Sequence, residues 1–249
     1  MELVSVIMPM HNAERFIDSA ITSVIEQTWQ NWELLVVDDA STDSSVYIVK
    51  EYEKRDPRIH LLVNKVHVYM PSAPRNVGVQ HARGRFIAFL DSDDYWLPRK
   101  LEEQLPLFEE NKVAVVYSHY EKMTEDGKRS NRVVYAPEFA NYKRLLYGNI
   151  IGNLTGVYDT KKVGKVFFDD IHHEDYVMWL SILKQGFVAK NTNTVTAVYR
   201  VRNNSVSSKK FSLLTWQWNV YRNVEHLNIP YSIYYYSNYA VRAFLKSLK

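Results

Sequence analysis

Three carboxylates within four residues close an apolar run, a spacing that could hold a metal ion. Residues 85–96 read RFIAFLDSDDYW, so Asp91, Asp93 and Asp94 follow a stretch typical of a buried strand. Like charges this close repel one another unless a cation lies between them. The pair Asp91-Ser92-Asp93 offers the oxygen ligands that Mn²⁺ or Mg²⁺ prefers, and such an ion keeps other positions for phosphate oxygens. The pattern predicts a site for a metal ion carrying a diphosphate.

Two other interpretations of these acids stay open. The carboxylates could cap a helix that begins near Pro98. They could also begin a calcium loop, because Glu102 lies at its twelfth position, but Trp96 stands where such a loop requires glycine.

A second pair of acids, Glu174 and Asp175, precedes a stretch with the apolar spacing of a buried helix face: Tyr176, Trp179, Leu180 and Leu183. The pair should lie in the first helical turn, where the helix dipole favours negative charge. Capping of the helix explains that position by itself. Only together with the metal motif does the position of these acids indicate a general base, which takes a proton from an attacking hydroxyl.

The elements that would position these acids alternate along the first hundred residues. Helical patterns at 16–25 and 41–54 lie between strand-like apolar runs at 4–9, 33–39, 59–64 and 85–91. This order predicts an α/β fold of the doubly wound, mostly parallel type, in which ligands bind at the carboxyl ends of the strands. Three polar clusters fall at those ends, at 11–12, 38–43 and 91–94.

The later part of the chain is less regular. Residues 114–138 predict two strands around an Asp126-Gly127 turn, and residues 139–149 predict a short helix. Because no flexible linker intervenes, we expect one domain over 1–208, with two lobes (1–95 and 96–208). Residues 209–249 should form a helical appendage.

Composition excludes several classes of protein. The 249 residues include no cysteine, so there is no disulfide, thiolate zinc site or cysteine nucleophile. The chain lacks the glycine-rich phosphate loops of dinucleotide folds and of P-loop NTPases. It also lacks a signal peptide and any apolar stretch of the roughly 18–20 residues that span a bilayer, so we expect a cytoplasmic protein.

The basic surplus is confined to residues 209–249, which hold six Lys and Arg residues, one acid and many aromatic residues. This mixture suits the surface of an anionic membrane, so a peripheral membrane contact is possible here. It also suits a pair of helices packed on the domain. Nucleic acid is not expected as a partner, because no nucleic-acid-binding motif accompanies the charge.

Four stretches resemble glycosyltransferase family 2, the inverting enzymes with the GT-A fold that use nucleotide sugars. They are VSVIMPMHNAERFIDSAITSVIEQTWQNWELLVVDDASTDSS, APRNVGVQHARGRFIAFLDSDDYWLP, HHEDYVMWLSILKQG and YRVRNNSVS, in the order of the family and covering about residues 3–208. The resemblance implies a hexose transferred from a UDP-sugar to a saccharide. It also implies that the lobe 1–95 binds the nucleotide sugar and that the lobe 96–208 binds the acceptor. Small bacterial members extend surface polysaccharide, such as O-antigen or capsule, on a polyprenyl diphosphate carrier.

The resemblance also implies roles for single residues. Asp175 would be the catalytic base, and Asp93 with Asp91 would bind the metal ion. The residues expected at the nucleotide and donor sugar are Pro9, His11, Asn12, Glu14, Asp39, Arg75, Asp91 and Ser92. Further diphosphate or acceptor contacts are expected from His173, Glu174, Arg200 and Arg202.

Two departures from the family pattern concern the donor site. Arg202 stands where relatives often have a histidine near the metal, so a third protein ligand is not expected there. The stretch NKVHVYMPSAPRN lacks the usual glycine after Asn64 and is longer than usual.

Two other functions remain as alternatives. One is a binding module for sugar nucleotides or glycans without catalysis. The other is a phosphatase of the haloacid dehalogenase type, with Asp91 as nucleophile and Asp93 as acid, although that motif normally ends the first strand of its domain and here ends the fourth.

Overall fold

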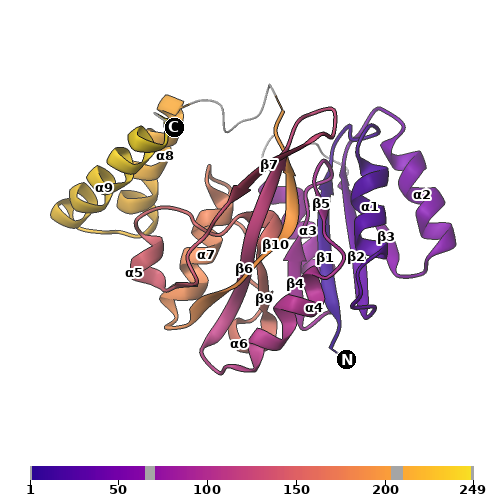
Figure 1. The fold of residues 1–249 in the computed structure, drawn as a ribbon, viewed down its shortest axis with the longest axis horizontal. Helices are drawn as coiled ribbons and strands as arrows, with labels where there is room; N and C mark the ends of the chain where they lie inside the picture. Colours follow the sequence, from indigo (N-terminus) through magenta and orange to yellow (C-terminus); the bar gives the residue numbers. More distant parts are fainter. Residues whose placement is uncertain (1, 65–70, 203–209, 248–249) are drawn as a thin grey trace.

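One sheet organises the molecule (Figure 1). Over residues 2–64, 71–202 and 210–247, which the computed structural model describes, ten strands join this sheet along the path β3-β2-β1-β4-β9-β6-β10-β5, with β7 beside β6 and β8 beside β10. The strands are β1 (Val4–Met10), β2 (Trp32–Asp39), β3 (Ile59–Asn64), β4 (Phe86–Phe89), β5 (Tyr95–Trp96), β6 (Val113–Met123), β7 (Arg129–Val134), β8 (Phe139–Ala140), β9 (Val157–Asp159) and β10 (Val188–Arg200).

Helices and helical turns connect the strands. They are α1 (Ile17–Ile25), α2 (Ser45–Arg55), α3 (Ser72–His81), α4 (Lys100–Gln104), η1 (Leu105–Glu109), α5 (Tyr142–Leu145), η2 (Asn153–Thr155), α6 (Thr160–Val163), α7 (Glu174–Lys184), α8 (Lys210–Asn219), the π-helical turn η4 (Val220–Val224) and α9 (Ile229–Ser247).

The N-terminal half of the sheet has the predicted parallel, doubly wound arrangement. β3, β2, β1 and β4 are all parallel, and the crossovers run through α1, α2 and α3. The chain passes from β1 to β2 and β3 on one side and then returns to β4 on the other side of β1. Such a reversal of strand order opens a crevice at the carboxyl ends of the strands, where ligands bind in folds of this kind.

The rest of the sheet is mixed. β9 is antiparallel to both β4 and β6, β10 is parallel to β6, and β5 is antiparallel to β10. The predicted turn at Asp126-Gly127 joins β6 and β7 as an antiparallel hairpin, with Gly127 at φ 88°. Strands from both predicted lobes therefore belong to a single sheet.

Two apolar cores lie on opposite faces of the sheet, because alternate residues of each strand point to opposite faces. In β1, Val6 and Met8 pack in the core that contains α1 and α2. Ile7 packs in the core that contains α3 and α7. All three side chains are fully buried, and burying a side chain of this size contributes about 1.5–3 kcal/mol.

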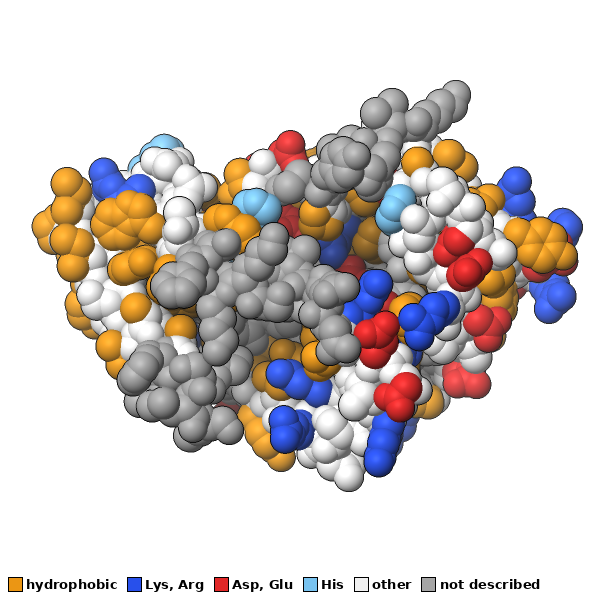
Figure 2. Space-filling model, turned by 90° about the horizontal axis from the view of Figure 1, so that it is seen from above, with side chains coloured by type: hydrophobic (Ala, Val, Ile, Leu, Met, Phe, Trp, Pro, Cys, Tyr) orange, Lys and Arg blue, Asp and Glu red, His pale blue; other side chains and the backbone are white. Residues whose placement is uncertain are grey.

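The C-terminal helices α8 and α9 lie at one end of the molecule (Figure 1) and only part of their aromatic surface is buried. Tyr221 is fully buried, and its hydroxyl donates to the backbone oxygen of Leu146 at 2.6 Å. In contrast, Tyr231, Tyr234 and Val241 of α9 are more than half exposed, at 59%, 52% and 57%. Figure 2 shows hydrophobic side chains gathered over this end of the molecule. Helical packing, one of the two predictions for this segment, thus accounts for some of its aromatic residues.

Within the described residues, no helix has both the length and the apolar character needed to cross a bilayer.

Candidate active site

The predicted nucleotide-contacting residues lie at the carboxyl ends of β1 and β2, in two loops that bind each other. The ring nitrogen Nδ1 of His11 donates to the backbone oxygen of Asp39 at 2.7 Å. The side-chain oxygen of Asn12, whose φ is 48°, accepts the backbone N–H of Thr42 at 2.8 Å. Pro9 lies within β1, directly before this loop. The structure thus brings Pro9, His11, Asn12 and Asp39 together.

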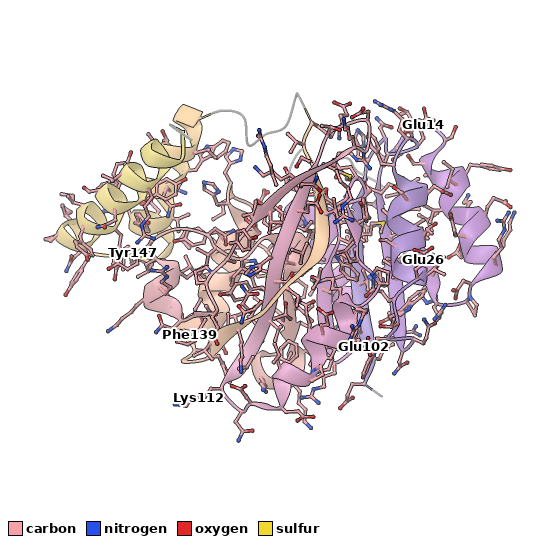
Figure 3. All side chains as sticks on the ribbon, viewed as in Figure 1. Glu14, Glu26, Glu102, Lys112, Phe139 and Tyr147 are labelled. Atoms are coloured by element: carbon pink, nitrogen blue, oxygen red, sulfur yellow. The ribbon has the colours of Figure 1, made fainter. Side chains whose placement is uncertain are left out.

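Glu14 joins the same pair of loops, at the upper edge of the molecule in Figure 3. Its carboxylate accepts the backbone N–H of Ser44 at 2.9 Å, and its own N–H donates to Asp43 at 3.0 Å. Slight burial opposes ionisation of Asp43, but hydrogen bonds from Ser45 and from backbone N–H groups outweigh it and lower the pKa of Asp43. These acids hold the loop in shape.

The two acids that end β2 are both buried. Asp38 accepts the backbone N–H of Ser41 at 3.2 Å, which is a role in the loop itself. Asp39 accepts the side-chain amide of Asn64, the last residue of β3, at 2.9 Å.

Arg75 connects the end of β4 with the start of α7. The guanidinium, which is only 6% exposed, donates to Asp91 at 2.6 Å and to Glu174 at 2.7 Å. Its helix, α3, lies close against β1 because Gly78 has no Cβ; an added Cβ would lie 2.4 Å from Ile7 Cγ2. The positive charge of Arg75 therefore lies between two acids that are far apart in the sequence.

Asp175 lies in the first turn of α7, as predicted, and faces a cavity. One carboxylate oxygen accepts the side-chain amide of Asn149 at 3.0 Å, and the other accepts the backbone N–H of Tyr176 at 2.7 Å. Burial raises the pKa of Asp175, and the charge of Asp91 adds to this effect, while Arg75 opposes it. Burial also raises the pKa of Glu174.

The cavity has a volume of about 650 Å³ and lies between the β4 edge, the start of α7 and α8. Asp91, Asp94, Glu174 and Asp175 make its walls acidic, and the only cation in the described lining is Arg75. Its other walls are largely aromatic, with Tyr120, Tyr135, Tyr199, His172, His173 and Trp216. The predicted base and the predicted metal loop thus face a common space, whereas the β1 and β2 loops lie outside it.

The turn after β4 carries the predicted metal ligands, with Ser92 half-buried between them. Burial and the nearby charge of Asp91 raise the pKa of Asp93, and Arg202 opposes this from 3.5 Å. Asp94 is 1% exposed; burial and the charges of Asp93 and Asp91 raise its pKa well above the usual range. One oxygen of Asp94 is buried without a hydrogen-bond partner.

Arg200 holds this turn in place. Its backbone N–H donates to Asp94 at 2.7 Å, and its guanidinium donates to the backbone oxygens of Asp93 and Glu125 at 2.8 and 2.9 Å. These contacts indicate a structural role for Arg200, while Arg202, about half exposed, lies next to Asp93.

The acids of this turn fit a divalent cation in their chemistry. Among the described residues no group of three or more His, Cys, Asp or Glu side chains is arranged to hold a metal ion, and Asp91 and Asp93 each have an arginine partner. However, one oxygen of Asp94 has no hydrogen-bond partner, and burial raises the pKa values of Asp93 and Asp94, so their ionised forms lack the stabilisation that a cation would supply. Oxygen ligands with such a charge are the donor set that Mg²⁺ or Mn²⁺ takes.

Several lining residues were not predicted. Asp94 belongs to the DSDD cluster, and its position after an apolar strand was a usable signal. Asn149 and Trp216 reach the cavity from segments without a motif, so nothing in the local sequence marks them.

Comparisons with known proteins identify the family. Residues 5–170 match the model of glycosyl transferase family 2. TuaG of Bacillus subtilis, named for teichuronic acid biosynthesis, is 39% identical over 99% of this chain and 98% of its own length. WfgD of Escherichia coli, named a UDP-Glc:alpha-D-GlcNAc-diphosphoundecaprenol beta-1,3-glucosyltransferase, is 41% identical over 96% of this chain and 92% of its own.

Solved structures share the fold. TarS of S. aureus in complex with UDP gives a TM-score of 0.72 at 21% identity, over 98% of this chain and 72% of that one. The mannosyltransferase PcManGT of Pyrobaculum calidifontis, in complex with GDP-Man and Mn²⁺, gives 0.70 at 18% identity, over 97% and 69%. The resemblance predicted from the sequence is thereby confirmed: this chain belongs to glycosyltransferase family 2.

Proposed function

We propose that the protein is an inverting, metal-dependent glycosyltransferase that moves a hexose from a UDP-sugar to a hydroxyl of a saccharide on polyprenyl diphosphate. The observation that carries this proposal is the cavity that both Asp175 and Asp91 line, together with Arg75. A base and a donor site must face one space for direct transfer. The names of WfgD and WfaP, which describe glucosyl transfer from UDP-Glc to a diphosphoundecaprenol-linked sugar, support the choice of donor and acceptor.

Asp175 acts as the general base of this reaction. The acceptor hydroxyl lies in the cavity next to its carboxylate and gives up its proton to it while the oxygen attacks the anomeric carbon. The bond from that carbon to the diphosphate breaks as the new glycosidic bond forms, so the configuration inverts and an α donor gives a β linkage. Asn149 and the N–H of Tyr176 orient the carboxylate for this step.

The donor lies across the carboxyl ends of β1, β2 and β4. Asp39 and the loop after β1 contact the uridine. Asp91 and Asp93 are the residues that would hold Mn²⁺ or Mg²⁺, and Arg202 lies next to Asp93. When bound, such an ion offsets the negative charge that grows on the departing diphosphate. Arg75 keeps Asp91 at the donor edge and Glu174 at the start of α7.

The test is a transfer assay with UDP-glucose and a short-chain analogue of α-GlcNAc diphosphoundecaprenol. We expect a product with a β linkage by NMR in the presence of Mn²⁺ or Mg²⁺ and no product with EDTA. Undiminished transfer in EDTA would contradict the metal dependence. Binding of UDP-glucose without hydrolysis or transfer would instead identify a binding module, and release of phosphate from a simple monoester would identify a phosphatase.

A lipid-linked acceptor also requires that the enzyme reach the membrane. We propose that α9 contacts the cytoplasmic face of the membrane. Its exposed Tyr231, Tyr234 and Val241 lie in a segment with a net positive charge. Replacing Tyr231 and Val241 by Ser should lower the fraction bound to phosphatidylglycerol vesicles and leave Tm unchanged, because both side chains are more than half exposed. Tyr234 is kept in this variant because its hydroxyl is hydrogen-bonded to that of Tyr147 at 2.9 Å. Unchanged sedimentation with the vesicles would remove α9 from this role.

A further inference from the structure

A pair of stacked rings lines the cavity next to the predicted base. The imidazole of His172 lies on the indole of Trp216 with 3.8 Å between ring centroids and 18° between planes. The ring of His173 meets the same indole edge-on, at 5.7 Å and 81°. His172 comes from the loop before α7, and Trp216 comes from α8. The pair therefore joins the C-terminal helices to the loop that precedes Asp175.

This wall lies outside the part of the chain that matches the family model. The match ends at residue 170, whereas His172 and Trp216 come later in the chain. The β4 edge, with Asp91, lies inside the match. The matched part thus supplies the β4 edge of the cavity, and the stacked pair of His172 and Trp216 comes from beyond it.

The charge of the cavity restricts what can lie against this wall. Four acids line it, and the guanidinium of Arg75 already has a carboxylate on each side. An additional phosphate here would face uncompensated negative charge, which is costly in a partly buried site. A neutral sugar ring suits both the acidic walls and the aromatic rings. Its hydroxyl groups can donate hydrogen bonds to the carboxylates, and its C–H face can pack on the rings.

We propose that His172 and Trp216 form a platform for the acceptor sugar and thereby determine which saccharide is glycosylated. This inference rests on the proposed function and adds the subsite that holds the acceptor. The sugar lies in the cavity with one hydroxyl at Asp175, and the diphosphate of the acceptor stays outside the acidic walls.

The first experiment compares three variants, Trp216→Ala, His172→Ala and Trp218→Ala. Trp218 is the matched control: it lies on the same helix, is 36% exposed, and meets Tyr236 edge-on at 5.3 Å instead of lining the cavity. An aromatic contact contributes up to about 1.5 kcal/mol, so we expect Trp216→Ala and His172→Ala to raise the acceptor KM about tenfold. The donor KM and the slow hydrolysis of UDP-glucose without acceptor should not change, and His172→Phe should restore most of the acceptor KM.

A merely structural role of the pair would give a different result. In that case Tm and donor hydrolysis would fall together with transfer, and His172→Ala, which removes an exposed side chain, would have no effect on the acceptor KM. An acceptor KM in both platform variants equal to that of Trp218→Ala would also overturn the proposal.

A second measurement does not depend on turnover, so it separates this proposal from the proposed function. In protein labelled with 5-fluorotryptophan, the signals of Trp216 and Trp218 are assigned from Trp216→Phe and Trp218→Phe. A neutral probe, propyl α-N-acetylglucosaminide, should shift the ¹⁹F signal of Trp216 and leave that of Trp218 in place. No shift with the saccharide, or a shift with inorganic diphosphate alone, would refute the platform even if the protein transfers glucose. Absence of transfer together with the saccharide shift would contradict only the proposed function.

Discussion

Two groups of acids lie at the same edge of the sheet. The protein favours the ionised form in one group and disfavours it in the other. In the loops after β1 and β2, Asp38 and Asp43 accept hydrogen bonds from backbone N–H groups, and the pKa of Asp43 is lowered. After β4 and at the start of α7, burial and neighbouring acids raise the pKa values of Asp94 and Asp175.

This difference in pKa and in hydrogen bonding indicates that the first group of acids serves folding and that the second group is available for function. The first group uses its charge to close loops, so its hydrogen-bonding capacity is filled by the protein itself. The second group keeps charge that the protein does not neutralise, which is the condition for taking up a cation or a proton from a substrate. Substitutions in the two groups should therefore have different, and in one case opposite, effects.

The largest effect should come from the predicted base. Asp175→Asn keeps the size of the side chain but cannot accept the proton of the acceptor hydroxyl, so kcat should fall roughly 10²–10⁴-fold, the range for a general base. Calorimetry should find UDP binding nearly unchanged. A kcat close to that of the unmodified protein would exclude Asp175 as the base.

The next effect concerns the cation. Asp93→Ala removes a carboxylate whose pKa is raised by burial and by the charge of Asp91. We expect the Mn²⁺-dependent part of UDP affinity to fall at least tenfold, the lower end of about 10–100-fold for groups that support a metal site. Asp43→Ala is the control from the acids in the loops after β1 and β2. In this variant, the Mn²⁺-dependent part of the UDP affinity should not change. Equal affinity for UDP in the presence of Mn²⁺ in the Asp93 variant would rule out its role as a ligand.

Opposite signs are expected for two Asp→Asn substitutions in protein without metal or nucleotide. Asp94 has a raised pKa when folded, so at neutral pH its charge destabilises the fold; Asp94→Asn removes the charge while its amide oxygen still accepts from Arg200. Asp43 has a lowered pKa, so its charge stabilises the fold above the pKa of the unfolded chain, and Asp43→Asn loses that contribution.

For effects of about 1 kcal/mol, Tm should rise by about 2–4 °C in Asp94→Asn and fall by a similar amount in Asp43→Asn. Differential scanning calorimetry in EDTA measures both. Shifts of the same sign in the two variants would show that the comparison between the two groups is wrong.

The smallest effect should appear in the pH profile of transfer. The base works deprotonated, so a raised pKa of Asp175 places the acidic fall of kcat at a higher pH than the value of about 3.9 for an ordinary aspartate. Asn149→Ala removes the hydrogen bond that favours the charged form and should move this fall further upward, by up to about one pH unit. A downward move would contradict the role of Asn149.

Features that are local in the sequence could be predicted. Each of the first four strands is rich in apolar residues and is followed by polar residues, so the parallel sheet, the DSDD turn and the polar clusters at 11–12 and 38–43 could be assigned from the sequence. The start of α7 was predictable for the same reason, because its buried face repeats with helical spacing. The catalytic, nucleotide and metal roles of these residues remain predictions.

Features that depend on distant contacts could not be predicted. Arg75 and Glu174 are 99 positions apart, and neither local pattern indicates that they pair. The aromatic tail shows the same limit: Tyr221 and Tyr234 both belong to it, yet the first is fully buried and the second is half exposed. Only the packing of α8 and α9 against the rest of the molecule decides between them.

The boundary at residue 170 has a practical consequence for engineering. Backbone hydrogen bonds hold the β4 edge within one sheet, while Trp216 comes from α8, a later helix that packs on His172. If this helix supplies half of the proposed platform, chimeras that exchange only the terminal helical segment between relatives should change the acceptor sugar and keep the sugar nucleotide of the unaltered framework.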